Sequence, residues 1–292
     1  MDSQSLKPNT LSLLKNLFKL RFLAIFLSLG FSSSLAFPEQ KEYRIVSLSP
    51  AITETLYDLE LDKYIVGTTS FSNYPEAAKS LPTVGSYLQP SIEKIVRLNP
   101  THVLVFKEGD PSIDRALKNA KLNYKVLNSR TLDDYQEMVR TIGSQFKAQK
   151  KAEDIIAKWK SQWAKLEHVP RTNEKILIQV DHMPIYIAGH DTFISRAFER
   201  CGLKNIFDNL EGYKKIQLES VLNRKPEIII AVGMLNQASD FESIRAFWRE
   251  NPITRNTRII KGNGDILGRL SLRFPTEVIK VCSQIKPLKA SE

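Results

Sequence analysis

The sequence is poor in the residues and motifs on which most enzymes depend. It has only two cysteines and four histidines among its 292 residues. It lacks both glycine-rich phosphate loops, G-x-G-x-x-G and G-x-x-x-x-G-K-S/T, so a nucleotide-dependent enzyme would have no phosphate cradle. H-E-x-x-H and G-x-S-x-G are also absent, and no cysteine or third histidine accompanies His182 and His190 at metal-ligand spacing. These absences favour a binding protein without a catalytic cofactor or metal site.

Residues 1–36 have the pattern of a cleaved secretory leader. A basic region precedes the apolar run FLAIFLSLGF, and Ser34-Leu35-Ala36 fits a small-x-small cleavage site. The alternative is an uncleaved membrane anchor, but the run is short for a span and no basic stop-transfer flank follows it. We therefore predict export with cleavage after Ala36. No cysteine follows the run, so a lipid-anchored form is not indicated.

The basic charge of the chain does not indicate a nucleic-acid partner. The formal net charge is +10, and the chain after Ala36 keeps +7 of it. Its lysines alternate with acids in segments such as KAQKKAEDIIAKWK, which is typical of a solvated helix face. An exported protein also rarely meets nucleic acid, so we expect no such partner.

Cys201 and Cys282 are the only cysteines. In an oxidising compartment an even number of distant cysteines favours one disulfide, and two buried free thiols are the alternative. A disulfide that closes a loop of this length would stabilise the fold by restricting the unfolded chain.

Strand-like and helix-like segments alternate along the chain, which predicts mainly parallel sheets covered by helices on both faces. In the helical segment AITETLYDL we expect Ile52, Leu56 and Leu59 to face the core, and Thr53 and Glu54 to face away. SLPTVGSY reads as a short third strand. Further strands are expected in RIVSLSP, YIVGTTSF, HVLVF, LNYKVLNS, KILIQVD, MPIYIAG, PEIIIAVG and TRIIKG, and further helices in TLDDYQEMVRTIGSQF, TFISRAFERCG, FESIRAFWRE and PTEVIKVCSQI.

One helix–strand unit occurs twice. SIEKIVRLNPTHVLV at 91–105 matches QLESVLNRKPEIIIA at 217–231 without a gap, so that Glu93 aligns with Glu219 and Pro100 with Pro226. Between the two copies, 143–168 contains no turn residue after Gly143 and carries one apolar stripe at helical spacing. We predict one long helix there, joining an N-lobe at 43–142 to a C-lobe at 169–290. A ligand cleft between the lobes is then the expected functional site.

The chain resembles a known family of exported proteins. RIVSLSPAITETLYDLELDKYIVGTTSFSNYPEAAKSLPTVGSY, followed by SIEKIVRLNPTHVLV, is similar to the opening of the periplasmic iron-complex and cobalamin binding proteins of ABC importers. The similarity runs from about Tyr43 to Pro287 and is strongest to the vitamin B12-binding branch. It implies a periplasmic α/β protein with two Rossmann-like lobes joined by a long helix, monomeric and not an enzyme. It also implies a disulfide between Cys201 and Cys282.

The resemblance assigns a set of ligand residues that suits a corrinoid, a broad disc with apolar faces and an amide-fringed edge. Aromatic rings would wall its faces, while Asp265 could accept from its amides and Arg269 could donate to its carbonyls or phosphate. Each aromatic could instead be core, and Asp265 could simply cap a turn. The family's tryptophans are replaced here by Tyr or Phe, and an aromatic pair by Ile266-Leu267. The implied ligand contacts are Phe71, Tyr87, Phe106, Tyr186, Tyr213, Asp265, Ile266, Leu267, Gly268 and Arg269, with Arg273 at a further matching position.

Glu93 and Glu219 each stand in the first turn of an expected helix, where the helix dipole favours a carboxylate. The resemblance implies a second role, as the pair that docks onto arginines of a two-fold permease with its ATPase subunits. The expected ligand is cobalamin, with haem or a ferric siderophore as alternatives. An exported enzyme on the same fold is the remaining alternative of another class.

Overall fold

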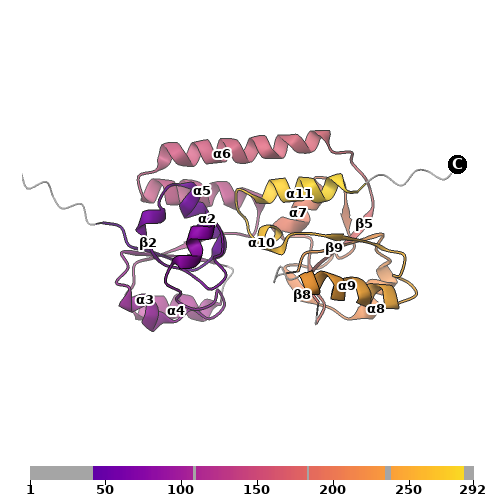
Figure 1. Cartoon of the computed structure of the whole chain (residues 1–292), viewed down its shortest axis with the longest axis horizontal. Helices are drawn as coiled ribbons and strands as arrows, with labels where there is room; N and C mark the ends of the chain where they lie inside the picture. The colour runs from indigo at the N-terminus through magenta and orange to yellow at the C-terminus, as the bar shows by residue number, and fades with distance from the viewer. Residues whose placement is uncertain (1–41, 108–109, 183, 234–237, 286–292) are drawn as a thin grey trace, which may run out of the picture. The chain divides into compact units, whose positions relative to one another are not determined.

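The computed structural model describes residues 42–107, 110–182, 184–233 and 238–285. The predicted leader at 1–36 lies outside these residues. The described residues from Tyr43 onward form one compact unit, which contains two sheets (Figure 1). None of the described helices is long and apolar enough to cross a membrane.

The first sheet is wholly parallel and forms the N-lobe, with strand order β2-β1-β3-β4. The two inner strands, β1 and β3, are short and almost wholly buried, as expected for a parallel sheet covered by helices, whereas the edge strand β4 is mostly exposed. Its elements are β1 Ile45–Ser47, α2 Pro50–Asp58, β2 Ile65–Gly67, α3 Ile92–Arg97, β3 His102–Phe106, α4 Pro111–Asn119, β4 Tyr124–Leu127 and α5 Leu132–Gln145, with 3-10 turns at Asp62–Tyr64 and Glu76–Ser80.

The second sheet forms the C-lobe and is mixed, with order β10-β9-β5-β6-β8. β5 pairs in parallel with β9 and with β7, whereas β6 is antiparallel to both β5 and β8. The elements are β5 Lys175–Asp181, β6 Tyr186–Ala188, α7 Phe193–Glu199, β7 Lys204–Asn205, β8 Tyr213–Lys215, α8 Leu218–Arg224, β9 Ile228–Ala231, α9 Ala238–Glu250, β10 Arg258–Lys261, α10 Gly264–Leu267 and α11 Phe274–Ser283.

The long connecting helix is α6, Gln149–Ala164, followed by a 3-10 turn at Lys165–His168. It packs against α5 of the N-lobe and α11 of the C-lobe (Figure 1). Trp159 carries this contact, because its ring stacks on Tyr135 at 4.1 Å and lies 6.4 Å from the ring of Phe274. The two α/β lobes and their helical connector are therefore as predicted, while the residue bounds given to the lobes stay predictions.

The predicted helix over 143–168 is wrong in one respect, because the chain turns within it. α5 continues to Gln145, Lys147 adopts a left-handed conformation with φ of 58°, and α6 begins at Gln149. Gly143 lies where α5 and α6 meet, and a Cβ added there would come within 2.6 Å of the Ala152 Cβ. Gly143 therefore permits the close approach of two helices rather than starting one.

Two further expectations about the N-lobe are wrong. SLPTVGSY forms only isolated bridges, Thr68 with Thr83 and Gly85 with Pro90, and no strand. Thr53 and Glu54 do not face away from the core, since they are 0% and 3% exposed. Ile52, Leu56 and Leu59 are buried as expected, so α2 is covered on nearly every side.

The repeated unit is a helix followed by a strand in both copies, α3–β3 and α8–β9. The equivalence extends to the backbone, because Asn99 and Lys225 both adopt left-handed conformations, with φ of 45° and 49°, directly before Pro100 and Pro226. A left-handed residue ends each helix, and the proline that follows cannot continue it. The same local sequence thus leads into an interior strand of each sheet, β3 in the N-lobe and β9 in the C-lobe.

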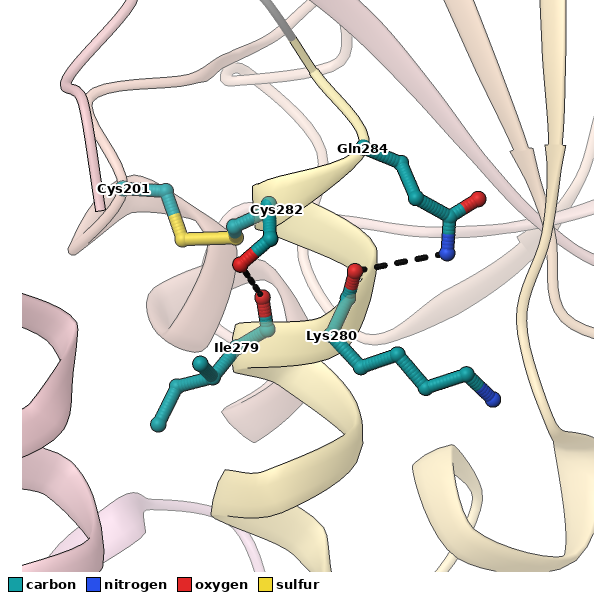
Figure 2. Close-up of a disulfide and its surroundings, with 6 residues drawn as sticks. Cys201, Ile279, Lys280, Cys282 and Gln284 are labelled. Carbon is teal, nitrogen blue, oxygen red and sulfur yellow. Dashed lines mark hydrogen bonds between the residues drawn. A yellow bond between two sulfur atoms is a disulfide. The ribbon is translucent and has the colours of Figure 1, made fainter.

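Cys201 and Cys282 form the disulfide, with their Cα atoms 6.3 Å apart. Figure 2 shows the sulfur–sulfur bond joining α11 to the chain that follows α7. Both cysteines are buried, at 4% and 2% exposure. The bond therefore fixes the last described helix to the body of the C-lobe.

Candidate functional site

A buried ion-pair cluster joins the two lobes. Glu54 of α2 accepts from Arg269 Nη1 at 3.0 Å and from Arg273 at 3.0 Å (Nε) and 2.6 Å (Nη2). Glu54 is 3% exposed, Arg269 8% and Arg273 23%. The guanidinium of Arg273 also lies 3.7 Å from the centre of the Tyr74 ring. A carboxylate buried to this degree requires such partners, because an isolated buried charge is very costly.

The remaining bonds of Arg269 reach the loop that carries Phe71. Nη1 donates to Asn73 Oδ1 at 2.7 Å, while Nη2 donates to the Phe71 carbonyl at 2.9 Å and to Asp265 Oδ1 at 2.8 Å. Asn73 in turn donates to Asp265 Oδ2 at 3.0 Å. The structure thus brings Phe71, Asp265 and Arg269 into one cluster, which we call the interlobe cluster: Glu54, Phe71, Asn73, Asp265, Arg269 and Arg273.

The short helix α10 sets the position of Asp265. The Asn263 side chain caps this helix by accepting from the Asp265 N–H, and the Asn263 N–H donates to Glu277 of α11. A Cβ on Gly264 would lie 1.6 Å from the Gly233 carbonyl oxygen, so only glycine fits where α10 meets the end of β9. The position of Asp265 is therefore fixed through the backbone around it. Asn263 caps α10, Gly264 packs closely on Gly233, and the buried Glu277 holds the Asn263 N–H.

A hydroxyl network holds the Phe71 loop from the N-lobe side. The Thr53 hydroxyl lies 2.8 Å from the Thr68 hydroxyl and donates to Ser47 at 2.8 Å, and Thr68 donates to Ser72 at 2.7 Å. All four side chains are buried. The Thr53 hydroxyl thus contacts Thr68 and Ser72 of this loop. Glu54 acts on the same loop through Arg269, which donates to Phe71 and Asn73.

Asp58 lies one helical turn beyond Glu54 on α2. Burial, and then the neighbouring Glu54 carboxylate, raise the pKa of Asp58 to about 6, although Lys158, Arg273 and Lys151 act in the opposite direction. Burial also raises the pKa of Tyr135, with the Asp58 and Glu54 carboxylates adding to the shift. Asp58 therefore keeps its proton to a higher pH than an exposed aspartate does, mainly because it is buried.

A second interlobe contact is more exposed. Arg130, which follows β4, forms an ion pair with Asp191, which follows β6. Asp191 Oδ1 also accepts from the Gly212 N–H at 2.5 Å. Desolvation works to raise the pKa of Asp191, but the Gly212 and Arg130 hydrogen bonds outweigh it and lower the pKa. The lobes are thus tied at two places by charge-assisted hydrogen bonds.

Exposed aromatic rings accompany these contacts. Phe71 is 50% exposed, Tyr186 36% and Tyr213 49%. In the β6–β8 ladder Ala188 pairs with Tyr213 and Tyr186 with Lys215, so the two tyrosines share one face as diagonal neighbours. Desolvation, with Asp191 and Tyr87 nearby, raises the pKa of Tyr213. Tyr87 of the N-lobe therefore lies close to the tyrosine face of the C-lobe.

Most of the other residues that were predicted to contact the ligand are less exposed to solvent. Phe106 is 6% exposed at the end of β3, and Leu267 is fully buried in α10. Ile266 is partly exposed and Gly268 is exposed beside it. Arg269, predicted to face a ligand, instead spends its four hydrogen bonds on protein acceptors in this structure. Direct ligand contact by any of these residues stays a prediction.

Sequence reasoning missed Glu54, Asn73, Arg130 and Asp191. Helical periodicity assigned Glu54 to the solvent face, because it cannot detect a partner that lies 215 residues away. The available signal was the motif S-L-S-P-x-x-T-E itself, in which a Thr-Glu pair closes the stretch that resembles the family. Both members of that pair are buried and hydrogen-bonded.

Glu93 and Glu219 are both exposed in the first turns of α3 and α8. Glu93 forms an intrahelical ion pair with Arg97 at 2.5 Å, whereas the position equivalent to Arg97 in α8 is Asn223. Exposed pairs of this kind contribute only about 0.3–0.5 kcal/mol. Both carboxylates are thus accessible on matching helices.

Comparisons with known proteins agree with this architecture. The vitamin B12-binding protein of Pectobacterium atrosepticum is 28% identical over 256 residues, covering 84% of this chain and 89% of that protein. The periplasmic vitamin B12 binding protein BtuF of Vibrio cholerae superposes with a TM-score of 0.70 at 25% identity, over 82% of this chain and 95% of that one. The apo periplasmic heme-binding protein RhuT from Roseiflexus sp. RS-1 gives a TM-score of 0.71 at 22% identity, with 82% and 97% covered.

The likeness to RhuT shows a shared fold alone, since the sequence identity is only 22%. The first two proteins share both sequence and architecture with the chain over most of its length. The family model described as periplasmic binding protein matches residues 45–263, and the chain therefore belongs to the periplasmic binding protein family.

Proposed function

We propose that this protein is the solute-binding component of an ABC importer and that it carries cobalamin between its two lobes in the periplasm. The observation that carries the proposal is the exposed ring of Phe71, whose own carbonyl is held by Arg269 beside Asp265. The Arg269 bond fixes the backbone that carries this half-exposed ring, so less backbone freedom remains to be lost when a flat ligand binds. Relatives named vitamin B12-binding proteins support the corrinoid as ligand.

The tyrosines of the C-lobe would complete the site. Tyr186 and Tyr213 share one face, and Tyr87 lies near Tyr213. These rings offer apolar surface together with hydroxyl groups, which suits a corrin face with an amide-fringed edge. Asp265 and Arg269 would exchange some of their mutual bonds for bonds to the ligand's amides or phosphate. Binding would thus weaken protein contacts in the interlobe cluster.

We also propose that Glu93 and Glu219 dock the loaded protein onto a two-fold permease. The two helices are equivalent by sequence and by backbone conformation, and both carboxylates are exposed. A symmetric partner requires such matched positions, one per lobe. The weak pair between Glu93 and Arg97 would be displaced at little cost.

Calorimetry of the purified chain without its leader tests the ligand. We expect cyanocobalamin to bind one to one, and Phe71→Ala to weaken binding by about 1–3 kcal/mol through the loss of ring contact. Val96→Ala is the matched control, because Val96 is a similarly exposed apolar side chain on α3, and it should bind normally. Absence of cobalamin binding, with binding of haem or a ferric siderophore instead, would assign a different ligand.

A further inference from the structure

Lys215 lies on the same face of the C-lobe as the two tyrosines of the proposed ligand site. In the β6–β8 ladder it is directly opposite Tyr186, and it follows Tyr213 by two residues on β8. Side chains of directly opposed residues share one face, with Cβ atoms about 4.5–5.5 Å apart, and residues two apart on a strand also share a face. This face therefore carries two phenol rings and one ammonium group.

The other face of the same ladder packs on the core of the lobe. Ile187 lies on that face, is fully buried and belongs to the cluster that contains Trp248. Lys214 pairs with Ile187 and so projects to the same side. Tyr186, Tyr213 and Lys215, by contrast, are all exposed. The tyrosine face is thus open at these three side chains.

The N-lobe lies close to the Tyr213 end of this face. Tyr87 contributes, after desolvation and Asp191, to the raised pKa of Tyr213. Arg130 forms ion pairs with Asp191 and, at 3.8 Å, with Glu211. The acids at this end of the face therefore already have a cation.

The ammonium group of Lys215, at the other end, forms no ion pair or side-chain hydrogen bond within the parts of the chain that the structure describes. An edge strand can carry lysine simply to oppose strand–strand association, but Lys214 would serve that purpose equally. Arg269, the other cation assigned to the site, already makes four hydrogen bonds to protein acceptors. Lys215 therefore offers the more accessible positive charge, beside two aromatic rings.

We infer that Lys215 is a specificity-determining residue of the ligand site, which binds an anionic oxygen group at the edge of the flat ligand. This inference rests on the proposed function. Cobalamin carries such a group in the phosphodiester of its nucleotide loop, whereas cobinamide has the same corrin ring without that loop. An ammonium group pairs with phosphate oxygens through charge-assisted hydrogen bonds. The tyrosines hold the ring, and Lys215 distinguishes the complete corrinoid from its precursor. The carboxylates of haem would offer the same anionic oxygens.

Calorimetric titration of the leader-free chain with cyanocobalamin and with dicyanocobinamide tests the inference. Lys215→Met keeps an unbranched apolar stem and removes the ammonium group. It should weaken the binding of cyanocobalamin at least about tenfold and leave the affinity for dicyanocobinamide unchanged. The loss should shrink as the salt concentration rises, because salt screens an exposed charge pair.

Lys214→Met is the matched control, since it removes the same charge from the neighbouring residue on the opposite face of β8. It should leave both affinities unchanged. Both lysines are exposed, so neither change should prevent folding, which circular dichroism checks. Unchanged cyanocobalamin affinity in Lys215→Met, an equal loss for both corrinoids, or an equal loss in Lys214→Met would overturn the inference and leave the proposed function standing. Binding of haem and of no corrinoid would instead overturn the proposed ligand, and unchanged haem affinity in Lys215→Met would then overturn the inference as well.

Discussion

Glu54→Gln should cost this protein far more stability than the loss of an ordinary surface ion pair. The carboxylate is 3% exposed and accepts three hydrogen bonds from Arg269 and Arg273. Glutamine keeps the shape but removes the negative charge, which leaves two guanidinium groups facing each other. Removing one partner from a buried ion pair typically costs about 3–5 kcal/mol. We expect a loss in that range.

The matched control is Glu93→Gln, which also removes a glutamate paired with an arginine. Glu93 and Arg97 are separated by 2.5 Å, but both side chains are about three-quarters exposed. Solvent screens such a pair, so its loss should cost no more than about 0.5 kcal/mol. The two variants differ in burial and not in the chemistry of the substitution.

Equilibrium unfolding in guanidinium chloride, followed by circular dichroism, measures both losses. A third variant, Glu54→Met with Arg269→Met, Arg273→Met and Asp265→Asn, separates charge from packing; the Asp265 change is needed because that carboxylate would otherwise lose its Arg269 partner. Replacing a whole buried ion cluster by apolar residues is often neutral, so this variant should lose less than Glu54→Gln alone. A loss below about 1 kcal/mol for Glu54→Gln would refute the reasoning, because it would mean that the cluster is solvated as a surface pair is.

Three further predictions concern other sites. Changing Glu93 and Glu219 together to alanine should leave ligand affinity unchanged and sharply reduce uptake or ATPase stimulation; normal uptake would remove their docking role. Asp58→Asn should raise stability at pH 7 by about 1–3 kcal/mol, because the folded-state pKa of about 6 exceeds the ordinary value. Between about pH 4 and 6 the folded wild-type protein binds more protons than the unfolded chain, so its free energy of unfolding should fall as the pH rises through that window. Urea unfolding at several pH values should show this slope for the wild-type protein and not for the variant. Reducing the Cys201–Cys282 bond, which spans 81 residues, should lower the free energy of unfolding by about 4–5 kcal/mol, measured with and without dithiothreitol, and a loss below about 1 kcal/mol would contradict the chain-entropy argument.

Local sequence determined the repeated architecture of this protein. A helix that ends before proline and leads into a β-branched strand is encoded within fifteen residues, and Asn99 and Lys225 adopt the same left-handed conformation at equivalent positions. Strand–helix alternation likewise predicted two α/β lobes with mainly parallel sheets, because hydrophobic periodicity is a local property. The stripe on the connecting helix was also predictable, since Trp159 and Trp163 recur at helical spacing and are both buried.

Only the tertiary structure decided the role of residues whose partners are distant in sequence. Gly143 looked like the start of a helix, but its packing against Ala152 makes it the contact between two helices. Glu54 looked like a solvent-facing residue, but Arg269 and Arg273 of the C-lobe bury it. Periodicity reports which face of a helix is apolar, whereas a buried carboxylate depends on a charge that the chain supplies more than two hundred residues later.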